Sequence, residues 1–224
     1  MEKEYVYREK KETGTASASD KKEGRPVYEF FKRLTDIVVS AVAMVVLAPL
    51  FLVIAVLIKI DGGPAFFVQE RAGKDEKYFI MDKFRSMVVD AEDMLDDLQS
   101  QNEADGFIFK MENDPRVTKM GNILRRTSLD ELPQLLNIFK GDMSLVGPRP
   151  PLRSEVEQYN DYQRQRLTIK PGLTCIWQCS GRSDVGLDEW MRMDMEYIEK
   201  RGYFYDWLLI FKTVPAVLTG KGAK

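Results

Sequence analysis

Two adjacent carboxylates, Asp130 and Glu131, lie in a stretch that also carries several arginines. The stretch spans residues 113–151 and reads NDPRVTKMGNILRRTSLDELPQLLNIFKGDMSLVGPRPP. Arginine can grip phosphate through two parallel hydrogen bonds, and Mg²⁺ commonly binds one or two carboxylates together with substrate phosphates. We therefore expect Arg125 and Arg149 to bind phosphate, and carboxylate chemistry with magnesium is open to this chain.

A helix is predicted to begin close to the two carboxylates, because Pro133 is tolerated only near a helix start. The free N–H groups at such a start favour phosphate. Ser128 and Glu131 also have the S-x-x-E spacing of a capping box, which would explain Glu131 without any function. The local sequence leaves both interpretations open. For three other arginines a surface salt bridge is expected, namely Arg116, Arg164 and Arg166.

Several further elements must position these residues. Extended segments are predicted at residues 66–69 and 78–81, followed by a basic cluster at Lys83 and Arg85. An acidic amphipathic helix should follow, with apolar positions at Ala91, Met94, Leu95 and Leu98. A loop carrying Arg182 precedes a helix over about residues 187–201, and the aromatic end of the chain is typical of an element at a membrane surface.

The composition excludes several classes of chemistry. The 224 residues include no histidine, which rules out imidazole catalysis and histidine-ligated metals. A net charge of -2 disfavours a nucleic-acid binder. Two cysteines, Cys175 and Cys179, are too few for a disulfide framework and lack the companions of a zinc site, so a reducing environment is expected.

A membrane segment is predicted at residues 37–58, which carry no charge. Their number, about 22, matches the length that a helix needs to cross the hydrocarbon core. Pro49 lies near the middle and should bend the helix, so the segment could cross the membrane or turn back. Positive residues flank both ends and leave the two interpretations open, namely Lys32, Arg33, Lys59 and Arg71.

From about Tyr28 to its end, the chain resembles the monotopic phosphoglycosyl transferases, or bacterial sugar transferases. The resemblance rests on several motifs in the same order: DGGPAFFVQERAG, KFRSM, residues 112–152, KPGLT, SGR and KTVPAVLTGKGA. Two departures are the cysteines in GLTCIWQCSGR, where the family is expected to have small or aliphatic residues. They could alter the pocket without touching the carboxylate pair.

The resemblance implies a reaction. Asp130 would attack the phosphate that bears the sugar of a UDP-sugar, release UMP and form a covalent phosphosugar intermediate, which polyprenol phosphate then attacks in a ping-pong scheme. Glu131 would coordinate Mg²⁺. Arg125 and Arg149 would hold phosphates, and the basic positions with less defined roles are Lys83, Arg85 and Arg182.

The resemblance also implies a membrane arrangement. The apolar helix would break at Pro49 and re-enter one leaflet, which places the catalytic domain on the cytoplasmic face of the bacterial inner membrane. We expect a polar disordered tail (1–27), a re-entrant helix (28–61) and a catalytic domain (62–224). The fold should be α/β to α+β, dominated by helices, with amphipathic helices on the membrane surface.

Two other functions are disfavoured by the same residues. A membrane scaffold that has lost catalysis is disfavoured, because Asp130 and Glu131 are both present. A nucleic-acid binder conflicts with the net charge and the apolar segment. The sequence leaves open the sugar, the final glycan, a homo-oligomer and downstream glycosyltransferases as partners.

Overall fold

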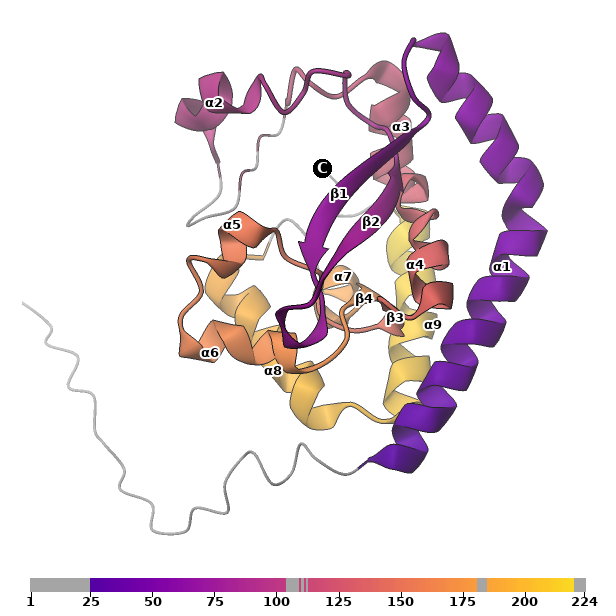
Figure 1. The fold of residues 1–224 in the computed structure, drawn as a ribbon, viewed down its shortest axis with the longest axis vertical. Coiled ribbons are helices and arrows are strands. Elements are labelled where there is room, and N and C mark those ends of the chain that lie inside the picture. The colour runs from indigo at the N-terminus through magenta and orange to yellow at the C-terminus, as the bar shows by residue number, and fades with distance from the viewer. Residues whose placement is uncertain (1–24, 104–108, 110, 112, 181–184, 220–224) are drawn as a thin grey trace, which may run out of the picture.

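The computed structural model describes residues 25–103, 109, 111, 113–180 and 185–219. Most of the predicted polar tail and Arg182 lie outside these residues. The described chain is dominated by helices and contains two small sheets of two strands each (Figure 1). This agrees with the predicted predominance of helices.

The apolar run lies in the C-terminal part of one helix, α1 (Pro26–Ile60), with Pro26 in its first turn and Pro49 inside it. Figure 1 shows α1 as a bowed helix along one edge of the molecule. By length and composition it could cross a membrane, and only 11% of its most apolar window is buried inside the protein. Such low burial is not that of a soluble core helix. Re-entry into one leaflet stays a prediction.

Both predicted extended segments are strands, and each is longer than expected. β1 (Phe66–Ala72) pairs antiparallel with β2 (Tyr78–Phe84), and Arg71 lies opposite Phe79 while Lys83 lies opposite Phe67. Because side chains alternate between the faces of a strand, Arg71 and Lys83 share one face of this hairpin. The second sheet, β3 (Ser144–Val146) parallel to β4 (Gly172–Thr174), joins distant segments.

The other helices are mostly short. The predicted helix over residues 187–201 is confirmed as α8, which ends at Lys200. The bounds in chain order are α2 (Leu95–Leu98), α3 (Lys119–Thr127), α4 (Gln134–Lys140), α5 (Arg153–Val156), α6 (Asp161–Arg164), α7 (Ile176–Cys179), α8 (Leu187–Lys200) and α9 (Tyr203–Thr219). Short 3-10 turns lie between β1 and β2, at Lys74–Glu76, and among the helices, at Gln99–Gln101, Leu129–Glu131 and Gln165–Thr168.

The predicted acidic helix is shorter than expected. Only Leu95–Leu98 is α-helical, followed by a 3-10 turn, and no side chain caps its start. Closely spaced acidic residues repel one another along a helix, which opposes its extension. Ala91 and Leu98 are nevertheless buried, so the segment does lie on the domain.

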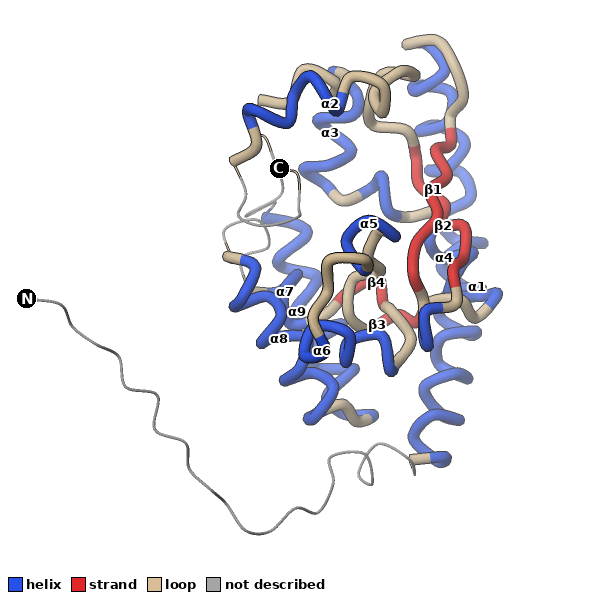
Figure 2. The backbone as a smooth tube through the Cα atoms, turned by 60° about the vertical axis from the view of Figure 1, so that its left-hand side comes forward, coloured by secondary structure: helices blue, strands red, loops and turns tan. Residues whose placement is uncertain are grey.

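The main hydrophobic core lies between α4, β3, α8 and α9, and α1 packs against it. Its buried members include Leu135, Ile138, Val146 and Ile198. Figures 1 and 2 show α4 and the small β3–β4 sheet between α1 and α8. This core holds the segment that contains the carboxylates against the β1–β2 hairpin.

Candidate functional site

The two carboxylates lie in a 3-10 turn, Leu129–Glu131, between α3 and α4. Ser128 ends α3 in the left-handed conformation, with φ of 56°, and its side chain does not cap the turn. The capping-box interpretation of Glu131 is therefore wrong, because Ser128 precedes the turn but its side chain makes no capping hydrogen bond, while its backbone ends α3. The expected position just before a helix is confirmed, since α4 begins three residues after Glu131.

The hairpin reaches the carboxylate turn through Lys83. Its Nζ lies 3.2 Å from Glu131 Oε1, and both side chains are partly exposed. The buried side chain of Asn137 in α4 holds β2 in place, because it accepts from Asp82 N (3.0 Å) and donates to Ile80 O (2.7 Å). Thus a single amide fixes the strand that carries Lys83.

Asp130 is the buried member of the pair, with 8% of its surface exposed. Burial raises the pKa of the Asp130 carboxyl to about 6, and the charge of Glu131 adds to this effect. The charges of Lys83 and Arg125 oppose it. Asp130 is therefore mostly ionised near pH 7, in a poorly hydrated setting where a carboxylate is a stronger nucleophile than in water.

Arg125 lies in the last turn of α3, and its Nε donates to Ser86 Oγ at 3.1 Å. Burial lowers the pKa of its guanidinium, whereas the nearby negative charge of Asp130 raises it. Arg149 is also close enough to act on that pKa. The structure thus brings three predicted site residues to Asp130, namely Glu131, Lys83 and Arg125, and places Arg149 near Arg125.

One charged residue near this cluster was not predicted as part of the site. Arg71, at the end of β1, is 5% exposed, and Arg149 and Glu131 are among the charges that act on its pKa. In the sequence it was counted only as a positive flank of the membrane segment. The strand alternation of VQERA would have placed it on the same hairpin face as Lys83.

Arg85 lies elsewhere. Its Nη2 donates to the carbonyls of Ile58, at 3.2 Å, and of Gly62, at the end of α1. This contact stabilises a helix terminus, where carbonyls lack intrahelical partners. A phosphate-binding role for Arg85 stays a prediction, and so does that of Arg182.

The arginines expected in surface salt bridges are paired, but two of the three pairs are buried. Arg164 does form an exposed pair with Glu76. Arg116 pairs with Asp114 and Arg166 with Asp194, each at 2.7 Å, and Arg166 is almost fully buried. The surface location was wrong for these two, because a buried arginine is tolerated when a carboxylate partner compensates its charge.

The carboxylate pair fits the chemistry of Mg²⁺. Within the described part of the chain, no group of three or more acidic or cysteine side chains gathers as a ready metal site. Mg²⁺ does not need one, because it binds through one or two carboxylates and takes its other ligands from water and substrate phosphates. Glu131, partly exposed beside the buried Asp130, is a suitable oxygen donor.

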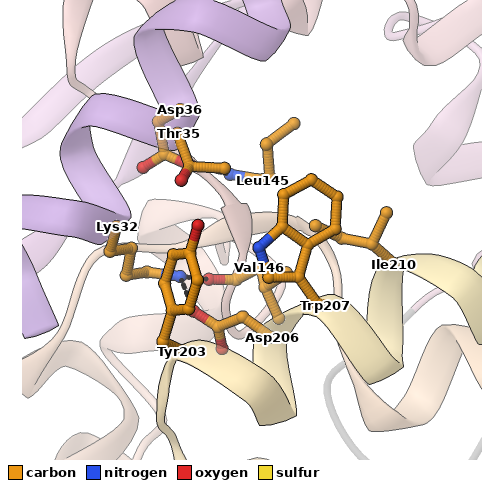
Figure 3. Close-up of a pocket in the computed structure, with 9 residues that line it drawn as sticks. All are labelled: Lys32, Thr35, Asp36, Leu145, Val146, Tyr203, Asp206, Trp207 and Ile210. Carbon is orange, nitrogen blue, oxygen red and sulfur yellow. Dashed lines mark hydrogen bonds and ion pairs between the residues drawn. The ribbon is translucent and has the colours of Figure 1, made fainter.

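A small pocket lies at a different place, between α1, β3 and α9 (Figure 3). Lys32 and Asp206 line it and form an ion pair of 2.7 Å. None of the carboxylate-turn residues lines it. The two cysteines are free thiols; Cys175 is buried in the main core, and Cys179 packs against that core with its Sγ 3.3 Å from Thr213 Oγ1.

Comparison with known proteins places this site in a family. The family model described as bacterial sugar transferase matches residues 27–220. The chain is 45% identical over 194 residues to galactosyl transferase CpsE of Streptococcus agalactiae serotype III (strain NEM316), covering 86% of this chain and 43% of that protein. It is 42% identical over 201 residues to undecaprenyl-phosphate galactose phosphotransferase of Salmonella typhimurium, covering 87% of this chain and 42% of that protein.

A third relative is similar in length. Exopolysaccharide production protein ExoY of Rhizobium meliloti is 41% identical over 204 residues, covering 89% of this chain and 90% of that protein. The chain therefore spans less than half of the first two relatives and most of the third. The extent of the family match and these identities show that the chain belongs to the bacterial sugar transferase family.

Proposed function

We propose that this protein transfers a sugar 1-phosphate from a UDP-sugar to undecaprenyl phosphate, with release of UMP. The observation that carries the proposal is the buried Asp130 carboxylate, with a pKa of about 6, beside Glu131, Lys83 and Arg125. The name of the Salmonella relative supports the carrier lipid and the type of transfer. The name of the Rhizobium relative supports a role in exopolysaccharide production.

In the first half-reaction, a carboxylate oxygen of Asp130 attacks the phosphorus atom that bears the sugar. The bond from that phosphorus to the UMP oxygen breaks, and its electron pair leaves with UMP. Arg125 and Arg149 hold the phosphates and offset their repulsion of the Asp130 carboxylate. The product is an acyl phosphate, in which the sugar 1-phosphate is bound through its phosphorus atom to a carboxylate oxygen of Asp130.

In the second half-reaction, an oxygen of undecaprenyl phosphate attacks the same phosphorus atom. The bond to Asp130 breaks, which regenerates the carboxylate, and no net proton or electron transfer is required. Glu131 would hold Mg²⁺, which when bound neutralises charge on the diphosphate and on the leaving UMP. Lys83, 3.2 Å from Glu131, orients that carboxylate.

The proposal includes a location, in which α1 enters and leaves the cytoplasmic leaflet of the cell membrane by bending at Pro49. Labelling of cysteines introduced as Val27→Cys and Asp61→Cys, in a background that lacks Cys175 and Cys179, tests it in closed vesicles. Both positions should react with an impermeant reagent from the same side. Reaction from opposite sides would show that α1 crosses the membrane.

The reaction is tested by UMP release from detergent-solubilised protein with Mg²⁺, undecaprenyl phosphate and a panel of UDP-sugars. Asp130→Asn should abolish release, whereas the exposed carboxylate variant Asp161→Asn should not change it. Without undecaprenyl phosphate, one equivalent of UMP should be released per protein, and the mass of the peptide with Asp130 should rise by a sugar phosphate. Release that always requires the carrier lipid would contradict the covalent scheme.

A further inference from the structure

The turn that carries Arg149 is held by its backbone carbonyls. Residues 148–151 read Pro-Arg-Pro-Pro, so three of the four lack an N–H group that could anchor the chain. Each of the four carbonyls instead accepts a hydrogen bond from another segment. The donors are Gly172 N to Pro148 O (2.9 Å), Arg166 Nη2 to Arg149 O (3.0 Å), Arg71 Nη1 to Pro150 O (3.2 Å) and Ala72 N to Pro151 O (2.9 Å).

The side chain of Arg149 contrasts with this anchored backbone. It is half-buried, and within the described part of the chain it takes part in no hydrogen bond or ion pair. A guanidinium fork on a rigid turn is suited to an anion that arrives from outside, because little conformational freedom is lost on binding. The turn therefore presents Arg149 to a ligand.

Arg71 supplies one of the two side-chain anchors. Its Nη2 donates to Gln69 Oε1 at 2.7 Å, while its Nη1 reaches Pro150 O. One planar fork thus joins β1 to the middle of the turn, a contact that the single ammonium of lysine could not reproduce. Since Lys83 lies on the same hairpin face and contacts Glu131, the hairpin contacts both the Arg149 turn and the carboxylate turn.

The charges of this arrangement also favour an anion. Burial and then the charge of Arg149 lower the pKa of Arg71 to about 10, so Arg71 is still cationic at pH 7. Two like charges in a poorly hydrated place repel each other, and a bound diphosphate would relieve that repulsion.

We propose that Arg71 is a positioning residue for the UDP-sugar diphosphate, which acts by fixing the turn that presents Arg149. This inference rests on the proposed function, because it assigns the diphosphate as the ligand of Arg149. It adds a residue that acts through another one and does not itself touch the reacting atoms.

A double-mutant cycle tests the inference, with kcat/KM for UMP release and the affinity for UDP measured for Arg71→Met, Arg149→Met and the double variant. Each single change should lower kcat/KM by about 10- to 100-fold, mainly through KM, as expected for a lost charge-assisted contact. The double variant should be within about twofold of Arg149→Met, because Arg71 acts through Arg149. Losses that multiply would overturn the inference.

Three further variants separate positioning from general stability. Arg71→Lys keeps the charge but lacks the planar fork, so its kcat/KM should stay as low as that of Arg71→Met. A kcat/KM equal to that of the native protein would contradict the proposal. Gln69→Leu removes the acceptor that orients Arg71, so it should lower kcat/KM about threefold in the native background and not at all with Arg149→Met. This milder change serves if Arg71→Met does not fold. Arg153→Met removes an exposed contact between α5 and β1, to Glu70, and should leave activity unchanged.

The two readouts distinguish this inference from the proposed function. If the native protein releases no UMP from any UDP-sugar, the proposed function fails, and the cycle on UDP affinity still reports whether Arg71 and Arg149 act together. If UMP is released but the two substitutions act independently in both readouts, only the role of Arg71 fails.

Discussion

At the scale of single residues, the site depends on the pKa of the Asp130 carboxyl, which its surroundings set. Burial disfavours the charged carboxylate, and Lys83 and Arg125 restore part of its stability. A nucleophile needs the charged form, but strong pairing with a cation would make it less reactive. A pKa of about 6 satisfies both demands near pH 7.

The release of UMP should therefore depend on the ionisation of Asp130. We expect kcat/KM for the UDP-sugar to rise with pH and to reach half its maximum near the pKa of about 6. Lys83→Met should move that midpoint to higher pH, because the charge of Lys83 lowers the pKa of Asp130. Initial rates between pH 5 and 8.5 in both proteins measure the shift. A profile that is flat over this range would exclude Asp130 as the titrating nucleophile.

At the scale of elements, the site depends on the close approach of α3 to the segment after β2. A Cβ added at Gly121 would lie 1.8 Å from the backbone oxygen of Ser86, far inside a van der Waals contact. Ser86 Oγ accepts from Arg125, which is in the same helix one turn after Gly121. The glycine therefore sets the distance at which Arg125 is held.

Gly121→Ala should lower the free energy of unfolding by about 1–3 kcal/mol, because backbone must move to admit the methyl group. It should also reduce UMP release, because the displaced α3 would move Arg125 away from Ser86. Chemical denaturation in detergent and initial rates measure the two effects. Gly186→Ala is the matched control, because an added Cβ there meets open space. Equal behaviour of the two variants would show that α3 tolerates a wider separation.

At the scale of the whole molecule, polar contacts join α1 to the rest of the protein. Asp206 in α9 accepts from Lys32 Nζ (2.7 Å), Tyr197 OH (2.8 Å) and Tyr28 OH (2.9 Å). Figure 3 shows Lys32 directed at Asp206 and Val146. On the same helix Asp36 accepts from Leu145 N in β3. These contacts fix where the apolar helix attaches to the domain.

Removing one partner of the ion pair between Lys32 and Asp206 should destabilise the protein. Lys32→Met leaves Asp206 as a buried charge without its cation and should lower the free energy of unfolding by about 3–5 kcal/mol. Replacing both partners, as Lys32→Met with Asp206→Leu, should cost less than Lys32→Met alone. Unfolding in detergent measures the free energy of unfolding of the native protein, of Lys32→Met and of the double variant. The exposed Lys59→Met serves as control. A double variant that is less stable than Lys32→Met would contradict a simple charge imbalance.

Local patterns in the sequence determined much of the framework. The charge-free run, the alternating segments near residues 66–84 and the periodic segment of α8 each act through neighbours in the chain, so their element types were predicted. The carboxylate pair was also recognisable, because adjacent acidic residues beside a proline and two arginines share a short stretch. The structure extends the two strands to Ala72 and Phe84.

Only the tertiary structure decided which distant residues meet. Ser128 has the sequence spacing of a helix cap, but in the structure it ends α3. Arg166 pairs with Asp194 inside the protein, and β3 pairs with β4, which lies far along the chain. Arg71 reaches the turn that carries Arg149 because the end of β1 is bonded to that turn, through Ala72 N to Pro151 O and Arg71 Nη1 to Pro150 O. A local pattern specifies the face on which a side chain lies, whereas its partner depends on how remote elements pack. The sequence by itself therefore singled out the carboxylate pair, and packing selected the cations that surround it.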